Sequence, residues 1–113
     1  MPKKYRLSHA DFARIPRAKA RRIHGTYFSL TVAPLPEGSG PKTACVVSKK
    51  IAARAIDRNG IQRRCREVLR SHLINIKQPF ALVFHAKREA VSASLADTKK
   101  DIDLMVVRAG VLA

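Results

Sequence analysis

The segment Ala52–Asn75 carries two stripes of side chains at helical spacing. One stripe recurs at i, i+4, i+7 and i+11, and the other repeats this spacing from a start two residues earlier. The first consists of Ile61, Cys65, Val68 and His72, and the second, here called the arginine row, consists of Asn59, Arg63, Arg66 and Arg70. Since each residue turns an α-helix by about 100°, the two stripes lie on opposite sides. The segment therefore predicts a long helix with one side packed on a core and guanidinium groups in water on the other.

Three segments around this helix have the composition of β-strands. Thr26–Ala33 and Thr43–Ser48 are rich in aromatic and β-branched residues. The Pro/Gly-rich stretch Pro34–Lys42 predicts a loop that joins them as an antiparallel pair. Phe80–Ala86 is almost continuously apolar, which predicts a central strand. The basic stretch Ala18–His24 is expected to be extended or irregular.

Two more helices are expected near the ends of the chain. Ser8–Pro16 opens with a serine and an aspartate in a capping-box-like pattern and closes on a proline. The last helix begins at about Ser92 or Ser94 and ends at Ala109, with Gly110 in the usual C-terminal position. Its expected apolar face holds Leu95, Ile102, Met105, Val106 and Ala109. Its acidic residues are expected on the solvent side: Asp97, Asp101 and Asp103. The fold class is α+β, with three helices on a small sheet of three to four strands, in one domain spanning residues 1–113.

The charge of the chain points to a polyanionic partner. Lys and Arg number 23 against 8 acidic residues, a net charge of +15 on 113 residues, while 46% hydrophobic residues still allow a core. Residues 1–24 and 49–70 hold sixteen of the 23 basic residues and only three acidic ones. On an ordinary solvated helix face the two signs alternate, which they do not do here, so a phosphate-binding surface is favoured. An anionic membrane is a weaker alternative, because the apolar residues of the long helix have strands to pack against.

Other classes of site find no support in the sequence. No apolar run approaches the ~20 residues of a membrane-spanning helix, and the N-terminus does not resemble a secretion signal, so a cytoplasmic protein is expected. Cys45 and Cys65 lack CxxC spacing, which favours reduced, core-type thiols over a disulfide or zinc site. The four histidines have no metal-ligand spacing, and His72 is expected to be hydrogen-bonded in the core or at its edge. No catalytic residue and no metal site are expected in the protein itself.

The run Val46–Leu69 resembles the signature of the bacterial ribonuclease P protein subunit. The shared pattern is a strand that ends in Val-Ser-Lys-Lys, followed by a helix with an Arg-Asn-Arg motif and further basic residues ending in Arg-Glu. Matching positions are Val47, Ser48, Lys49, Lys50, Ala55, Arg58, Asn59, Ile61, Arg63, Arg64, Arg66 and Glu67. Weaker similarity extends to Arg6-Leu7, Asp11-Phe12 and Ala81–Phe84. The sequence departs from the family at Gly60 and Gln62, where basic residues are usual, and at Pro16, where an aromatic is usual.

The resemblance implies a protein that works with a large catalytic RNA, which binds Mg²⁺ and cuts the 5′ leader from precursor tRNA. It also implies a mixed sheet with a left-handed βαβ crossover and a monomeric protein in the holoenzyme. The motif helix would face the RNA subunit, and Phe12 and Lys49 would border a cleft for the leader, although Phe12 could equally be a core residue. The RNA-binding residues expected are Lys49, Lys50, Arg54, Arg58, Asn59, Arg63, Arg66 and Arg70.

Two other functions remain open from the sequence. A small structural protein of ribosomal type, bound to rRNA, would share this size and charge. A nuclease that uses its own side chains would need a metal-binding cluster, which the sequence does not contain.

Overall fold

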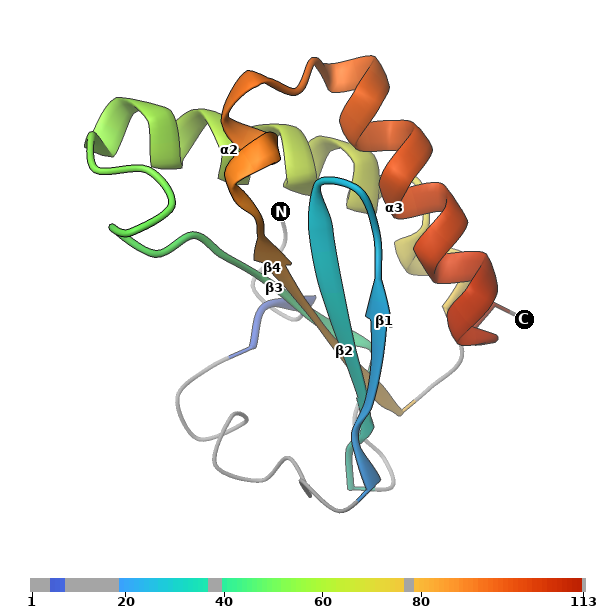
Figure 1. Ribbon diagram of the computed structural model, residues 1–113. Coiled ribbons are helices and arrows are strands. Elements are labelled where there is room, and N and C mark those ends of the chain that lie inside the picture. Colours follow the sequence, from blue (N-terminus) through green and yellow to red (C-terminus); the bar gives the residue numbers. More distant parts are fainter. Residues whose placement is uncertain (1–4, 8–18, 37–39, 77–78, 113) are drawn as a thin grey trace.

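The computed structural model describes residues 5–7, 19–36, 40–76 and 79–112 (Figure 1). The order of elements is β1 (Arg21–His24), β2 (Phe28–Pro34), β3 (Lys42–Val46), α2 (Ala55–Arg70), β4 (Phe80–Ala86) and α3 (Leu95–Ala109). Short 3₁₀ helices occupy Leu73–Asn75 and Arg88–Ser92. The helix predicted at Ser8–Pro16, with Phe12 in it, lies outside the described residues.

The four strands form one mixed sheet in the order β1-β2-β4-β3. Strand β2 is antiparallel to β1 and to β4, whereas β3 is parallel to β4. The prediction that Thr26–Ala33 (β2) and Thr43–Ser48 (β3) form an antiparallel pair is therefore wrong, because β4 lies between them. β4 is apolar on both faces and gains most burial with a neighbour on each edge. Its central position, and the α+β class, are confirmed.

Both described helices pack on the same face of the sheet (Figure 1). Leu30 on β2 and Phe84 on β4 are fully buried beneath them. The apolar stripe of α2 is confirmed at Ile61, Cys65 and Val68, which are at most 5% exposed. Burying one large apolar side chain contributes about 1.5–3 kcal/mol, so this layer holds α2 in place whatever its outer side carries.

Helix α2 is shorter than the sequence predicted. It begins at Ala55 rather than Ala52 and ends at Arg70 rather than Asn75. After a turn at Ser71, the chain continues as the 3₁₀ helix Leu73–Asn75, so His72 lies just beyond α2. Because no glycine or proline marks these ends, the helical spacing of the side chains predicted a helix that is too long at both ends.

Helix α3 has the ends that the sequence predicted. Ser94 and Asp97 form a capping box, and Gly110 closes the helix at φ +67°, in the left-handed region. Leu95, however, is 47% exposed, so its assignment to the buried face is wrong. Leu95 is the first residue of α3 and follows the 3₁₀ helix Arg88–Ser92 by only two residues, so the periodicity of the later turns does not place it on the buried face.

Asp101 was expected on the solvent side of α3 but is buried at 6% exposure. Its carboxylate accepts hydrogen bonds from the backbone N–H groups of Thr26, Tyr27 and Phe28 at 2.8–3.1 Å. The turn approaches so closely that a Cβ on Gly25 would lie 2.7 Å from both carboxylate oxygens. Asp101 therefore ties α3 to the turn between β1 and β2.

The opposite face of the sheet carries a smaller buried cluster. It consists of Leu7, Leu35, Ala81 and Val83. Leu7 belongs to a short N-terminal stretch that bridges β3 at Arg6 and Thr43 in parallel register. In the part of the chain that the structure describes, no helix is long and apolar enough to cross a membrane.

Candidate nucleic-acid interface

The arginine row lies along one exposed side of α2, as its spacing predicted. Asn59, Arg63, Arg66 and Arg70 are all exposed, while Ile61 and its stripe face the sheet. Within the described residues, no carboxylate forms an ion pair with these three arginines. Successive turns of a helix are about 5.4 Å apart, so the row is a line of closely spaced positive charge. Such a line is suited to a polymer of phosphates.

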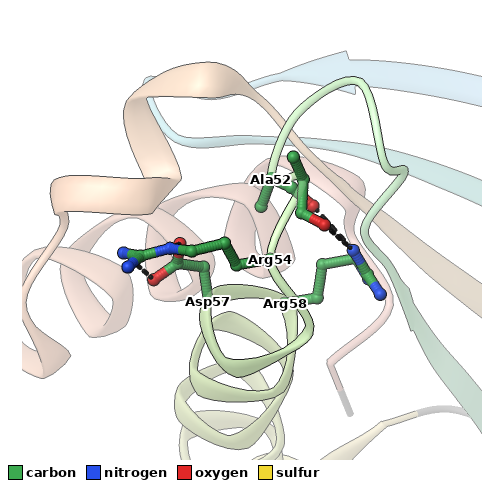
Figure 2. Close-up of polar contacts among 5 residues, drawn as sticks. Ala52, Arg54, Asp57 and Arg58 are labelled. Carbon is green, nitrogen blue, oxygen red and sulfur yellow. Dashed lines mark hydrogen bonds and ion pairs between the residues drawn. The ribbon is translucent and has the colours of Figure 1, made fainter.

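The arginines at the start of α2 are engaged within the protein (Figure 2). Arg54 contacts Asp57 through two nitrogens, at 2.8 Å and 3.3 Å, so its charge is partly neutralised. Arg58, the first residue of the Arg-Asn-Arg motif, donates from Nη1 to the carbonyl oxygens of Ala52 and Ala53 at 2.9 and 2.7 Å. Arg58 thus fixes the loop before the helix, in addition to any contact that it makes outside the protein.

That loop presents the two lysines of the Val-Ser-Lys-Lys signature. The backbone N–H groups of Ile51 and Ala52 both donate to the carbonyl of Ser48 at 3.1 Å, which closes a tight turn. Lys49 and Lys50 lie in this turn and are exposed. Both lysines therefore lie just before the N-terminus of α2, on a loop that Arg58 stabilises through its hydrogen bonds to Ala52 and Ala53.

Of the three departures from the family, Gly60 and Gln62 lie inside α2, and Pro16 lies outside the described residues. Gly60 is in the interior of α2, and the helix continues through it without a break. The side-chain amide of Gln62 is 3.4 Å from the carbonyl oxygen of Cys45 at the edge of β3. Gln62 therefore faces the sheet edge, where it replaces a charge by a contact within the fold.

Some basic residues outside the predicted set donate hydrogen bonds to backbone carbonyl groups. Arg21 donates to the carbonyl of Ala109 at 2.7 Å, and Lys87 donates to that of Gly25 at 2.6 Å. Arg64 reaches the carbonyl of Ala90 at 3.4 Å, and its buried Nε has no hydrogen-bond partner in the described structure. Part of the positive charge counted in the sequence is thus used to join elements of the fold.

Beyond the cluster of Leu7 and Leu35, the second sheet face carries a row of side chains across all four strands. His24, Ser29, His85 and Val46 are neighbours in the register of β1, β2, β4 and β3. The Ser29 hydroxyl is 3.4 Å from Nδ1 of His24. Partial burial, assisted by the charge of Arg22, lowers the pKa of His85. The sequence could have indicated this row only through the alternation of each strand, and its register was not predictable.

The two thiols lie together between β3 and α2. Cys65 is buried and Cys45 is half-buried, and both are free. The hydrogen bond with Cys45, together with burial, raises the pKa of the Cys65 thiol well above its ordinary value. Within the described ranges, no group of three or more His, Cys, Asp or Glu side chains could hold a metal ion.

Comparison with known proteins gives one consistent result. A family model described as Ribonuclease P matches residues 1–110. The "Ribonuclease P protein component" of Pseudanabaena sp. is 29% identical over 113 residues, covering 99% of this chain and 97% of the relative. That of Acidothermus cellulolyticus is 29% identical over 110 residues, covering 96% and 90%. The structure of Staphylococcus aureus RNase P protein shares the fold, with a TM-score of 0.82 at 24% identity over 96% of this chain and 98% of that one. The chain belongs to the ribonuclease P protein family.

Proposed function

We propose that this chain binds the RNA subunit of ribonuclease P through the exposed side of α2 and promotes removal of the 5′ leader from precursor tRNA. The observation that carries the proposal is the arginine row, which is exposed and has no acidic partner among the described residues. Guanidinium groups bind phosphate oxygens through two parallel hydrogen bonds, which suits such a row to an RNA backbone. The proposed RNA contacts are Lys49, Lys50, Arg54, Arg58, Asn59, Arg63, Arg66 and Arg70.

In this proposal the RNA subunit supplies the chemistry and binds the Mg²⁺ ions. An active site made of RNA crowds phosphates around its metal ions and repels an anionic substrate. A protein of net charge +15 lowers that repulsion and so raises the affinity for precursor tRNA. The side chains of this protein bind and position RNA and take no part in bond cleavage.

The second sheet face is proposed to hold the single-stranded leader. Its row from His24 to Val46 offers two imidazole rings and an aliphatic side chain at one level of the sheet. Stacking of a base on a ring contributes about 1–3 kcal/mol and tolerates any sequence, as a variable leader requires. The lowered pKa of His85 favours the neutral ring at pH 7. Phe12 and Lys49 are proposed to border the same cleft.

Three further features are proposed with this function. The connection from β3 through α2 to the parallel strand β4 would be left-handed, against the general rule for βαβ units. The protein would act as a monomer within the holoenzyme. It would be located in the cytoplasm, with its precursor tRNA substrate. An experimental structure and the mass of the assembled complex test the first two.

The function is tested by adding the full chain to a ribonuclease P RNA at low Mg²⁺ concentration. We expect faster cleavage of precursor tRNA and tighter binding of precursor than of mature tRNA, because only the precursor has a leader. No gain in cleavage or in precursor affinity would contradict the proposal. Equal binding of precursor and mature tRNA, without a gain in cleavage, would instead indicate a structural RNA-binding protein of ribosomal type.

A further inference from the structure

A cavity of about 160 Å³ lies at the outer edge of β3, between the N-terminal stretch and α2. Its lining consists of Arg6, Thr43, Ala44, Cys45, Arg66 and Leu69. Liquid water takes about 30 Å³ per molecule, so the cavity has room for a group of several heavy atoms. A single tetrahedral oxyanion is a ligand of this size.

The two arginines reach the cavity from distant parts of the sequence, and the backbone of each is held firmly. Arg6 is bridged to Thr43, and the next N–H, that of Leu7, donates to the Thr43 carbonyl at 3.1 Å. Leu7 is itself buried on the second face of the sheet. Arg66 follows the fully buried Cys65 on α2. Both guanidinium groups are therefore exposed side chains on fixed supports.

The cavity is unbalanced in charge. Among the described residues, its lining contains two guanidinium groups and no carboxylate. Neither arginine forms an ion pair with any residue in the described ranges. Two like charges that share a small space repel each other, and an anion between them removes that repulsion. The apolar side chains of Ala44 and Leu69 in the lining limit the access of water and so strengthen the attraction.

The ligand that fits this arrangement is a phosphate group. Each guanidinium presents a planar fork of donors that matches two phosphate oxygens. Arg66 also belongs to the arginine row, so a phosphate in the cavity continues the line of positive charge from α2 to the edge of the sheet. That continuity favours a phosphate of a polymer over a free ion.

We propose that Arg6 and Arg66 together bind one backbone phosphate of the RNA in the cavity at the β3 edge. The proposal rests on the proposed function, because the ribonuclease P RNA supplies the phosphate. It adds Arg6 to the proposed RNA contacts, whereas the sequence indicated only that the basic segment 1–24 as a whole favours phosphate binding.

The test uses the full chain and its cognate ribonuclease P RNA, with binding measured over a series of salt concentrations. The variants are Arg6→Gln, Arg66→Gln and the double variant. When one phosphate is no longer bound, the slope of log K against log salt becomes shallower by about 0.7 for single-stranded and 0.9 for duplex RNA. Because both side chains bind the same phosphate, the double variant should show the change expected for one phosphate, and each single variant part or all of it.

The size of the change in slope decides the outcome. A change in the double variant of about 1.4 to 1.8, as expected for two separate phosphates, would overturn the proposal. An unchanged slope would do the same. A parallel titration with inorganic phosphate, followed by the amide NMR signals of Ala44 and Cys45, identifies the source of the anion. Saturable shifts together with an unchanged RNA slope would mean that the cavity takes a free ion, which also overturns the proposal.

Two controls separate this cavity from folding and from the function as a whole. Arg108→Gln removes an equal charge from an exposed position on α3 and should leave the slope nearly unchanged. Arg6→Lys retains the charge but not the planar fork, so it should keep most of the slope and lose affinity. Circular dichroism checks that each variant is folded. If the protein promotes leader-dependent cleavage but Arg6→Gln leaves the slope of log K against log salt unchanged, only the proposed phosphate site in the cavity is refuted. If the unaltered chain does not bind RNA, the proposed function itself is refuted.

Discussion

Helices α2 and α3 pack on the same face of the sheet but use their charges in opposite ways. All three carboxylates of α3 are bound within the protein: Asp97 closes the capping box, Asp101 binds the turn between β1 and β2, and Asp103 contacts His72. On α2, the arginine row has no such partner in the part of the chain that the structure describes. The acids of α3 hold the fold together, and under the proposed function the exposed bases of α2 bind RNA.

This difference separates stability from binding along the two helices. A charge that is hydrogen-bonded inside the protein contributes to folding, and its removal leaves partners unsatisfied. A row of exposed like charges slightly weakens the fold by repulsion, and its removal costs the fold little. Substitution of the bound carboxylates of α3 is therefore expected to affect unfolding, and substitution of the arginine row of α2 to affect RNA binding.

The largest effect is expected for Asp101→Ala on α3. The substitution leaves three backbone N–H donors without their acceptor, and each such loss costs roughly 1–3 kcal/mol when the donor is buried. We expect the free energy of unfolding to fall by about 3 kcal/mol or more, measured by urea denaturation. The matched control is Asp57→Ala on α2, whose exposed pair with Arg54 should contribute less than about 1 kcal/mol. Equal losses in the two variants would contradict the division between the helices.

The reverse pattern is expected for Arg63→Gln combined with Arg70→Gln. Both side chains are exposed, so the free energy of unfolding should change by less than about 0.5 kcal/mol each. The ribonuclease P RNA should be bound through two fewer phosphates, which makes the salt slope shallower by about 1.4 to 1.8. Lys100→Gln with Arg108→Gln removes the same charge from α3 and should leave the slope nearly unchanged. A similar change in both pairs would show that only net charge matters.

Local patterns in the sequence predicted the parts of this contrast that depend on a single element. The spacing of Ile61, Cys65 and Val68 was enough to orient α2, because helical periodicity is a property of the segment itself. Ser94 and Gly110 marked the ends of α3 for the same reason. The arginine row followed from the same spacing, so this part of the candidate site was predictable.

What the sequence could not predict depends on contacts between distant segments. To predict that β4 pairs with both β2 and β3, one would have to know the order of the strands in the folded sheet. The burial of Asp101 required the β1–β2 turn to bring its N–H groups to α3. The use of Arg58 on two loop carbonyls and the meeting of Arg6 with Arg66 likewise depend on the folded chain. For the charged residues, the sequence predicted exposure from charge alone. That prediction holds only for side chains that the fold does not bring to a hydrogen-bonding partner.

A smaller effect is expected for Asp103→Asn, and it should depend on pH. Burial works to raise the pKa of Asp103, but the hydrogen bonds from Lys99 and His72 and their charges outweigh it, so that the pKa is lowered. The unfolded chain then takes up this proton at a higher pH than the folded chain, so the stabilisation is present above the ordinary pKa and is lost as pH falls through the lowered one. At pH 7 the substitution should cost less than about 1 kcal/mol, because the carboxylate is 33% exposed.

Urea denaturation of the unaltered protein and the Asp103→Asn variant, repeated from pH 7 to pH 3, checks this expectation. The difference between their free energies of unfolding should be present at about pH 5 and shrink below about pH 4, near the ordinary pKa of aspartate. A difference that stayed constant to pH 3 would show that the two hydrogen bonds do not depend on the charge of Asp103.

The smallest effect is expected for Gly60→Ala, because Gly60 is the residue of α2 with the lowest helix propensity. A glycine inside a helix costs about 1 kcal/mol relative to alanine, and nothing in the sequence prevents the exchange. In the structure, the new Cβ would lie 3.3 Å from Nη1 of Arg64, the flexible end of a side chain that reaches Ala90 at only 3.4 Å. We expect Arg64 to shift slightly and the free energy of unfolding to rise by about 0.5 kcal/mol, with an unchanged salt slope for RNA binding. Gly60→Arg, which restores the residue usual in the family, should instead steepen that slope by up to about 0.9. Destabilisation by alanine would show that the contact of Arg64 with the loop at Ala90 is rigid, and that α2 depends on it more than on helix propensity.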